Sequence, residues 1–260
     1  MTTDDGTARV RMDEMPWTEY RERVGGGAIV VVPVGATEQH GHHLPLGVDA
    51  HIATAVATRA AVRVGGVVAP TLAYGYRSQP RTGGGTSFPG TTGLDGHTLA
   101  FLLRDVLREL AAGGARRIAI VDGHYENEMF LTDGIELALR EFRRDRLNAR
   151  VVKLRYFEEV DEQTIALLWP DGYPGMALEH AALMETSMML ALRPDLVHLE
   201  LAPDDGPAAF PPFDVYPPDP SWVPPSGALS SPSRATPAFG EHLLGRSVDL
   251  VVGALQEGFA

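Results

Sequence analysis

The sequence predicts an α/β fold, a single layered domain in which a mainly parallel central sheet is flanked by helices. Short β-branched runs alternate along the chain with longer stretches of helical periodicity, a pattern typical of parallel sheets with crossover helices. The clearest run, residues 28–34, is apolar on both faces, as expected for a strand that is covered on both sides. With 260 residues, of which 44 % are hydrophobic, the chain can bury a large core.

The predicted elements follow that strand in alternating order. A helix at 51–64 ends before Gly65 and Gly66, and a second strand occupies 67–70. A helix at 95–112 carries leucines at helical spacing and ends before another pair of glycines. The remaining predicted elements are strands at 117–121 and 150–154 and helices at 127–144, 179–192 and 239–258.

Two stretches are too rich in glycine or proline for regular structure. Residues 74–92 are glycine-rich, and a loop of this length inside a compact domain is typically a lid or a binding loop. Residues 203–237 hold eleven of the chain's 20 prolines, interleaved with aromatic residues such as Phe210 and Trp222. Because disordered linkers rarely contain so many aromatic residues, we expect an ordered arm that packs on its own domain or on a neighbouring subunit.

Composition excludes several function classes. There is no cysteine, which rules out disulfide scaffolds, thiolate zinc sites and cysteine nucleophiles. The net charge of −12 repels phosphate backbones and anionic membranes, so neither nucleic acid nor a membrane is an expected partner. The first ten residues do not form a signal peptide, and the longest apolar stretch, residues 28–36, is too short to span a bilayer. We therefore expect a cytoplasmic protein.

The segment after the first strand concentrates potential metal ligands. Residues 38–51 contain four of the chain's nine histidines together with Glu38 and Asp49. Ligands of open α/β sheets bind beyond the carboxyl ends of the strands, where this segment must lie. Glu38 and His40 are two residues apart and share a face in extended backbone. Imidazole and carboxylate without thiolate suit zinc, manganese or iron. The alternative is a polar loop in which Asp49 is only a helix N-cap.

A second polar segment follows the buried strand at 117–121. His124 and Glu126 are again two residues apart, and Gly123 allows a tight turn before them. Two histidines and two glutamates from two strand ends, with Asp49 as a bridge, would form a two-metal site. A third group, Glu179, His180 and Glu185, lies at the start of a predicted helix; these side chains could cap the helix or transfer protons.

These motifs together resemble the creatininase (creatinine amidohydrolase) family. The resemblance rests on residues 33–46 (PVGATEQHGHHLPL), on residues 122–127 (DGHYEN) and on the third group. It extends to the glycine-rich loop, with YGYRSQ at 74–79, and to the proline-rich arm at 210–220, so that it covers about residue 31 to the C-terminus.

The resemblance implies a site and an assembly. Two divalent ions, Zn²⁺ and/or Mn²⁺, would be bound, one by Glu38, Asp49 and His124 and the other by His40, Asp49 and Glu126. His180 would transfer protons with support from Glu179 and Glu185, and Glu126 would also serve catalysis. Contacts to a small-molecule substrate would come from Tyr125, Ser78, Phe157, Met176 and Glu185. Family members are cytoplasmic homohexamers, in which an aromatic-rich arm would suit an interface.

Three features depart from the family pattern. Phe157 and Met176 align with two tryptophans that shape the pocket around the flat creatinine ring. Asp122 stands where asparagine is usual, and His43 and His51 add imidazoles near the predicted metals. The roles of these two histidines and of His42 stay open. The expected centre is therefore intact, whereas the substrate wall differs.

The expected reaction is hydrolysis of the C–N bond of a small cyclic amide, creatinine or a close analogue. Two metal ions would lower the pKa of a water and polarise the carbonyl, and His180 would protonate the leaving nitrogen. The sequence contains neither a Gly-x-Ser-x-Gly elbow nor a phosphate-binding loop lysine. The alternatives are the same centre acting on an open-chain amide, a formamide, a short peptide or a non-amide ring, or a non-catalytic scaffold.

Overall fold

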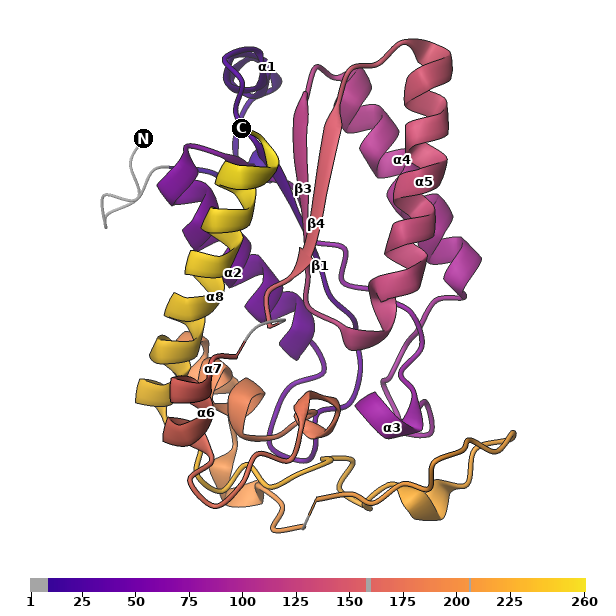
Figure 1. The fold of residues 1–260 in the computed structure, drawn as a ribbon, viewed down its shortest axis with the longest axis vertical. Helices are drawn as coiled ribbons and strands as arrows, with labels where there is room; N and C mark the ends of the chain where they lie inside the picture. The colour runs from indigo at the N-terminus through magenta and orange to yellow at the C-terminus, as the bar shows by residue number, and fades with distance from the viewer. Residues whose placement is uncertain (1–8, 158–159, 206) are drawn as a thin grey trace.

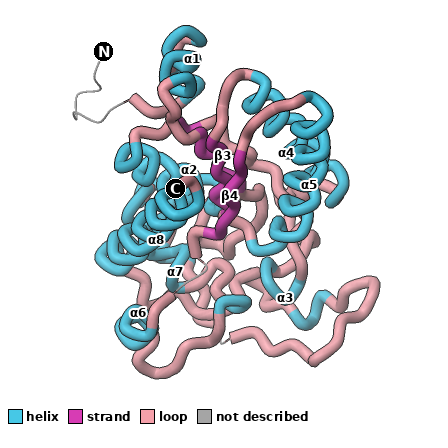
Figure 2. The backbone as a smooth tube through the Cα atoms, turned by 45° about the horizontal axis from the view of Figure 1, so that its top comes forward, coloured by secondary structure: helices cyan, strands magenta, loops and turns pink. Residues whose placement is uncertain are grey.

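The computed structural model describes residues 9–157, 160–205 and 207–260, and its centre is a four-stranded parallel sheet. The strand order is β2-β1-β3-β4, with β1 and β3 in the middle. The strands are β1 (Val30–Val34), β2 (Val67–Val68), β3 (Arg117–Asp122) and β4 (Arg150–Arg155). The predicted parallel sheet is therefore confirmed. Figure 2 shows strands of the sheet between the two groups of helices.

Helices cover both faces of the sheet, which gives three layers (Figure 1). On one face lie α2 (Val48–Val64), α7 (Leu183–Leu192) and α8 (Pro237–Gly258); on the other lie α4 (Gly96–Ala112) and α5 (Glu128–Asp145). Alternate residues of β1 contribute to the two cores: Val31 packs with the first group, whereas Val30 and Val32 pack with the second. This alternation explains why the strand is apolar at every position.

One predicted boundary was wrong in a way that matters for the site. The helix predicted to start at residue 179 begins at Leu183. Ala181 has a positive φ of 53°, which interrupts a right-handed helix before it. Glu179 instead accepts a hydrogen bond from the backbone N–H of Met184 at 3.0 Å, so its side chain satisfies a free donor of the first helical turn.

The other predicted elements lie within three residues of the observed bounds, and three α-helices in the described part of the chain were not predicted. The most useful shift is at α2, which begins at Val48 rather than at 51 and so places Asp49 in its first turn. The missed helices are α1 (Trp17–Gly25), α3 (Pro80–Gly83) and α6 (Glu162–Leu168). The first and last of these bury one and two residues respectively, which leaves no apolar stripe for periodicity to detect.

The proline-rich arm, residues 203–237, runs beneath the sheet and returns to α8 (Figure 1). Its backbone contacts the rest of the molecule near the predicted third group: the N–H of Leu229 donates to the carbonyl of His180 at 3.0 Å. Residues 226–230 are buried, whereas Phe213 and Tyr216 are exposed. One part of the arm therefore supports His180, and another part presents aromatic rings to solvent.

Strand register brings three loops together at one edge of the sheet. Val34, the last residue of β1, pairs with Asp122 of β3, and Asp122 pairs with Arg155 of β4. The segments that follow these residues carry Glu38, His124 and Tyr156, so the candidate site lies beyond the carboxyl ends of the strands. No helix in the described part of the chain is long and apolar enough to span a bilayer.

Candidate metal centre

Asp49 connects two histidines that come from different loops. Its Oδ1 lies 3.1 Å from His40 Nε2, and its Oδ2 lies 3.0 Å from His124 Nδ1. Asp49 does not cap α2, whose N-cap is Gly47, so the helix start carries the carboxylate into the cluster instead. Glu38 Oε1 is 3.1 Å from His124 Nδ1, and Glu185 Oε1 is 3.6 Å from His40 Nε2.

The buried ligand atoms converge without satisfying one another. Glu38 Oε2, His40 Nε2 and Asp49 Oδ2 have no hydrogen-bond partner, although the last two lie close to atoms of opposite polarity. Leaving such groups buried and unpaired costs about 1–3 kcal/mol each. Each of the three residues belongs to groups of potential ligands whose atoms lie within 4.8 Å of one another, so cations bound in those groups would satisfy them. Their chemistry and arrangement therefore fit a metal site.

Two groups of potential ligands share Asp49. Glu38, Asp49 and His124 form one, and His40, Asp49 and Glu185 form the other; the ligand atoms of each lie within 4.8 Å of one another. A carboxylate that belongs to both groups is the arrangement that a pair of bridged ions requires.

Backbone carbonyls orient both histidines. His40 Nδ1 lies 3.1 Å from the carbonyl of Glu38, and His124 Nε2 lies 3.0 Å from the carbonyl of Tyr76. A carbonyl can only accept, so the ring proton is placed on these nitrogens. The opposite nitrogens, His40 Nε2 and His124 Nδ1, face the Asp49 carboxylate, which is where a metal-ligating nitrogen would lie.

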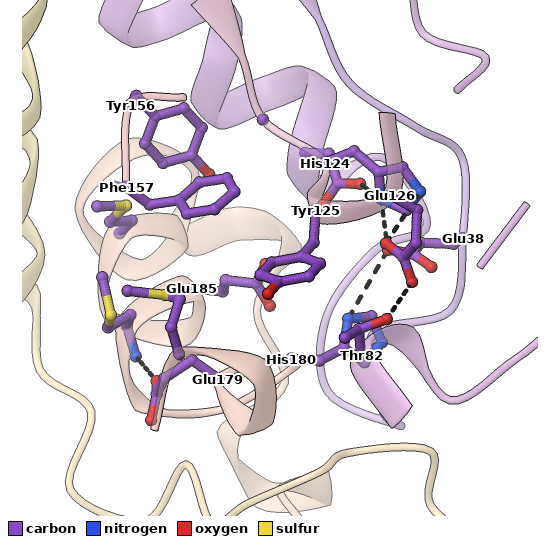
Figure 3. Close-up of a pocket in the computed structure, with 15 residues that line it drawn as sticks. Glu38, Thr82, His124, Tyr125, Glu126, Tyr156, Phe157, Glu179, His180 and Glu185 are labelled. Carbon is purple, nitrogen blue, oxygen red and sulfur yellow. Dashed lines mark hydrogen bonds and ion pairs between the residues drawn. The ribbon is translucent and has the colours of Figure 1, made fainter. Parts of the chain in front are cut away.

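Glu126 lies on the other side of His124. Its Oε2 is 3.4 Å from His124 Nε2, and its Oε1 accepts hydrogen bonds from Thr82 Oγ1 and from the backbone N–H of Gln79. Among the described residues Glu126 belongs to none of the ligand groups, and Glu185 rather than Glu126 stands beside His40. Both glutamates line the same cavity (Figure 3).

His180 adjoins the cluster and is held by a residue that the sequence did not single out. Its ring lies 4.4 Å from that of His40, and its Nδ1 is 3.7 Å from Glu38 Oε1. The amide nitrogen of Gln39 lies 2.8 Å from His180 Nε2, and the Gln39 oxygen accepts from the N–H of Gly41. The same amide nitrogen donates to the carbonyls of Gly83 and Gly227, so Gln39 connects His180 to the glycine-rich loop and to the arm.

Burial dominates the electrostatics of the cluster. Burial raises the pKa of Glu38 to about 7 against the opposing influence of His124, and it raises the pKa of Glu179 to about 8. Burial would also raise the pKa of Asp49, but His40 and His124 together hold it below its usual value. For His180, burial and the nearby His40 lower the pKa well below the usual value, so its ring is neutral.

The cavity beside the cluster has one polar and one apolar wall. The polar wall includes Glu38, Asp49, His124 and Glu126, and the apolar wall includes Tyr156, Phe157, Met176, Met184 and Met188. Of the predicted substrate contacts, Tyr125, Phe157, Met176 and Glu185 line this cavity. Ser78 is not among the residues that line it; its hydroxyl donates to the carbonyl of Gly83 at 2.7 Å.

The three histidines with open roles lie outside the ligand groups formed by the described residues. His42 is exposed, and His51 is half-buried at the start of α2. His43 is fully buried, and its Nε2 lies 2.9 Å from Thr186 Oγ1. Burial lowers the pKa of His43 to about 4, with a further contribution from His40. His43 is therefore a neutral residue of the core, packed beside Thr186 of α7.

Sequence reasoning missed Gln39, Thr82 and Tyr156. Gln39 stands between two predicted ligands, and Tyr156 directly follows the strand predicted at 150–154, so the rule about strand ends could have flagged both. Nothing in the spacing marks Thr82, which meets Glu126 only because the glycine-rich loop folds back as α3.

Comparison with known proteins decides the family. A family model described as creatininase, creatinine amidohydrolase, matches residues 13–255. The creatinine amidohydrolase of Pseudomonas putida is 48% identical over 253 residues, which cover 96% of this chain and 97% of that protein. The chain belongs to the creatininase family. The resemblance that the motifs predicted is thus confirmed.

Solved creatininases share the whole fold and include metal-containing forms. A manganese creatininase has a TM-score of 0.94 and 47% identity, covering 96% of this chain and 98% of that chain. A creatininase variant complexed with creatine also has a TM-score of 0.94 and 47% identity, over 97% of this chain and 99% of that one. A further variant is of Zn-Zn type. These forms agree with the predicted zinc and manganese cofactors and with the ligand groups around Asp49.

The chain is also similar to a hydrolase with a different substrate. A mycofactocin precursor peptide peptidase of Mycobacterium tuberculosis (strain H37Rv) is 32% identical over 232 residues, covering 85% of this chain and 81% of that protein. Family membership therefore supports hydrolysis more firmly than it supports any one substrate.

Proposed function

We propose that this protein is a binuclear metal-dependent amidohydrolase that converts creatinine to creatine. The observation that carries the proposal is the pair of ligand groups that share Asp49, with the neutral His180 beside them. The level of similarity to the Pseudomonas putida creatinine amidohydrolase supports the choice of substrate.

The proposed ligands are Glu38, Asp49 and His124 for one ion and His40 and Asp49 for the other. Glu185 completes the second set in the conformation described, and Glu126 is the alternative that the family resemblance implies. When bound, two divalent ions supply a water of lowered pKa and polarise the amide carbonyl.

The chain's own residues would position the substrate and move protons. His180 is neutral and can therefore take a proton from the attacking water and then deliver one to the leaving nitrogen. Glu179 is protonated at neutral pH because burial raises its pKa to about 8, and its contact with Met184 fixes the turn that carries His180. Glu126 lies 3.4 Å from His124 Nε2, and its own position is held by hydrogen bonds from Thr82 and Gln79.

The apolar wall would hold the flat face of the substrate. Tyr125 is 40% exposed at the cavity mouth, where the Arg155 guanidinium lies 5.3 Å from the centre of its ring. The same guanidinium lies 5.7 Å from the ring of Phe157, so one cation spans two of the proposed substrate contacts. Met176 completes the wall, whereas Ser78 would reach a substrate only if its bond to Gly83 opened.

A different small amide is the second candidate. Phe157 and Met176 line the cavity where the family resemblance leads us to expect tryptophans. Incubating zinc- or manganese-loaded protein with creatinine, a formamide and a short peptide, with His180→Gln as the control, separates the candidates. Creatine formation that His180→Gln abolishes supports creatininase activity, and turnover of another amide alone supports the second candidate.

Assembly and location belong to the same proposal. The exposed Phe213 and Tyr216 of the arm supply apolar surface of the kind found at subunit interfaces, which supports the homohexamer implied by the resemblance. Light scattering coupled to size-exclusion chromatography would measure the subunit number. We also propose a cytoplasmic location, which fractionation of cells producing the protein would test.

A further inference from the structure

Tyr156 lines the proposed catalytic cavity, directly after β4. Its backbone N–H donates to the carbonyl of Asp122 at 3.3 Å. The pairing between β3 and β4 therefore extends one residue beyond the end of β4. Its side chain is 3% exposed and points into the cavity toward Tyr125 and Glu185 (Figure 3).

Packing alone fixes the ring of Tyr156. The ring of Phe157 meets it edge-on, with centroids 5.2 Å apart and an interplanar angle of 87°. On another side the backbone of Gly123 passes so close that a Cβ there would lie 3.0 Å from the tyrosine Cε1. The hydroxyl is therefore held at one place without any hydrogen bond of its own.

The hydroxyl has no hydrogen-bond partner among the described residues. Buried tyrosine hydroxyls usually find a partner, so this one is unusual. It also differs from the Tyr20 hydroxyl, which is both unpaired and sealed from solvent. The Tyr156 oxygen is not sealed in this way, and a molecule that enters the cavity can reach it.

The neighbours of this hydroxyl favour its neutral form. Burial raises the pKa of Tyr156 well above its usual value, and the carboxylates of Glu185, Asp49 and Asp122 raise it further. Gly123, which approaches the tyrosine ring at Cε1, directly precedes the proposed ligand His124 and lines the same cavity, so a substrate held at the metal ligands lies within this cavity together with the hydroxyl. A neutral phenol at this position is a hydrogen-bond donor.

We propose that the Tyr156 hydroxyl donates a hydrogen bond to the carbonyl oxygen of the bound amide and strengthens it as that oxygen becomes an anion. This inference rests on the proposed amidohydrolase function. In the step concerned, a water oxygen bonds to the carbonyl carbon, and the C=O π electrons move onto the carbonyl oxygen. His180 takes a proton from that water. The electrons on the oxyanion then re-form the C=O bond as the C–N bond breaks, and His180 passes its proton to the leaving nitrogen. Tyr156 keeps its proton throughout and acts only through its hydrogen bond.

Tyr156→Phe removes the hydroxyl and leaves the packing of the ring. We expect kcat for creatinine to fall about 100-fold, with KM changed less than about threefold, because the loss falls mainly on the transition state. The Kd for creatine, whose carboxylate contains the former carbonyl oxygen, should rise about tenfold by calorimetry. The melting temperature and the number of bound ions should stay at the wild-type values, since no bond within the protein is lost.

Tyr20→Phe is the matched control, because it removes an equally unpaired hydroxyl far from the cavity. It should change neither kcat nor the Kd for creatine. If the wild type is active and Tyr156→Phe is equally active, this inference is wrong, although the proposed function stands. The same holds if Tyr156→Phe loses activity together with a lower melting temperature or a loss of metal. A metal-replete wild type that does not convert creatinine would overturn the proposed function and this inference with it.

Discussion

His43 should make the protein sensitive to acid, and the size of the effect follows from its burial. The ring is fully buried beside Thr186, and burial lowers its pKa from the usual 6.5 to about 4. In the unfolded chain the ring takes up a proton near pH 6.5, whereas in the folded protein it does so only near pH 4. Between these values the unfolded state binds more protons, so the free energy of unfolding falls as the pH falls.

The total effect is about 3 kcal/mol, because each pKa unit corresponds to about 1.4 kcal/mol. About 2 kcal/mol of this should be lost between pH 7 and pH 5. Urea unfolding of chelator-treated wild type and His43→Gln at several pH values measures it. The stability difference between the two proteins should change by about 2 kcal/mol over that interval, whatever the substitution itself costs.

His42→Gln is the control, since His42 is adjacent in sequence but exposed. It should leave the slope of stability against pH unchanged. The reasoning about His43 would be refuted if His43→Gln unfolded with the same pH slope as the wild type.

Three further predictions concern the centre and its cavity. Asp49→Asn should lower the metal content from two ions per chain to one or none, measured by plasma mass spectrometry; two retained ions would show that Asp49 does not bridge. Gly83→Ala should cost about 1–3 kcal/mol in urea unfolding and weaken metal binding, because its Cβ would press on the Ser78 hydroxyl and approach Glu38 Oε2 within 2.8 Å; a neutral effect would contradict the packing described. Phe157→Trp should raise kcat/KM for creatinine about 2- to 10-fold, since a larger ring adds contact with a flat substrate; an unchanged value would show that this wall does not meet the substrate.

The location of the site at the carboxyl edge of the sheet could be predicted from the sequence, because it depends only on which segments form strands and which residues follow them. Residues 28–34 and 117–121 read as buried strands, and polar residues follow both. Parallel strands end at the same edge, so Glu38 and His124 had to lie near each other. The observed 3.1 Å between Glu38 Oε1 and His124 Nδ1 is the outcome of that rule.

The partner of His40 could not be predicted in this way. Choosing between Glu126 and Glu185 depends on where α7 begins and on the positive φ of Ala181, and neither is visible in a hydrophobic pattern. The roles of Gln39 and Thr82 likewise depend on the folding of the glycine-rich loop and the arm, whose shapes are set by local backbone geometry rather than by periodicity.

The central claim is that the two ligand groups around Asp49 hold a metal pair that hydrolyses creatinine. The most direct test is to load the protein with zinc or manganese, confirm two ions per chain, and measure creatine formed from creatinine by mass spectrometry. The account predicts steady creatine formation, which a chelator abolishes and added metal restores. The Asp49→Asn variant should form no creatine. A folded protein that holds two ions per chain and forms no creatine would contradict it.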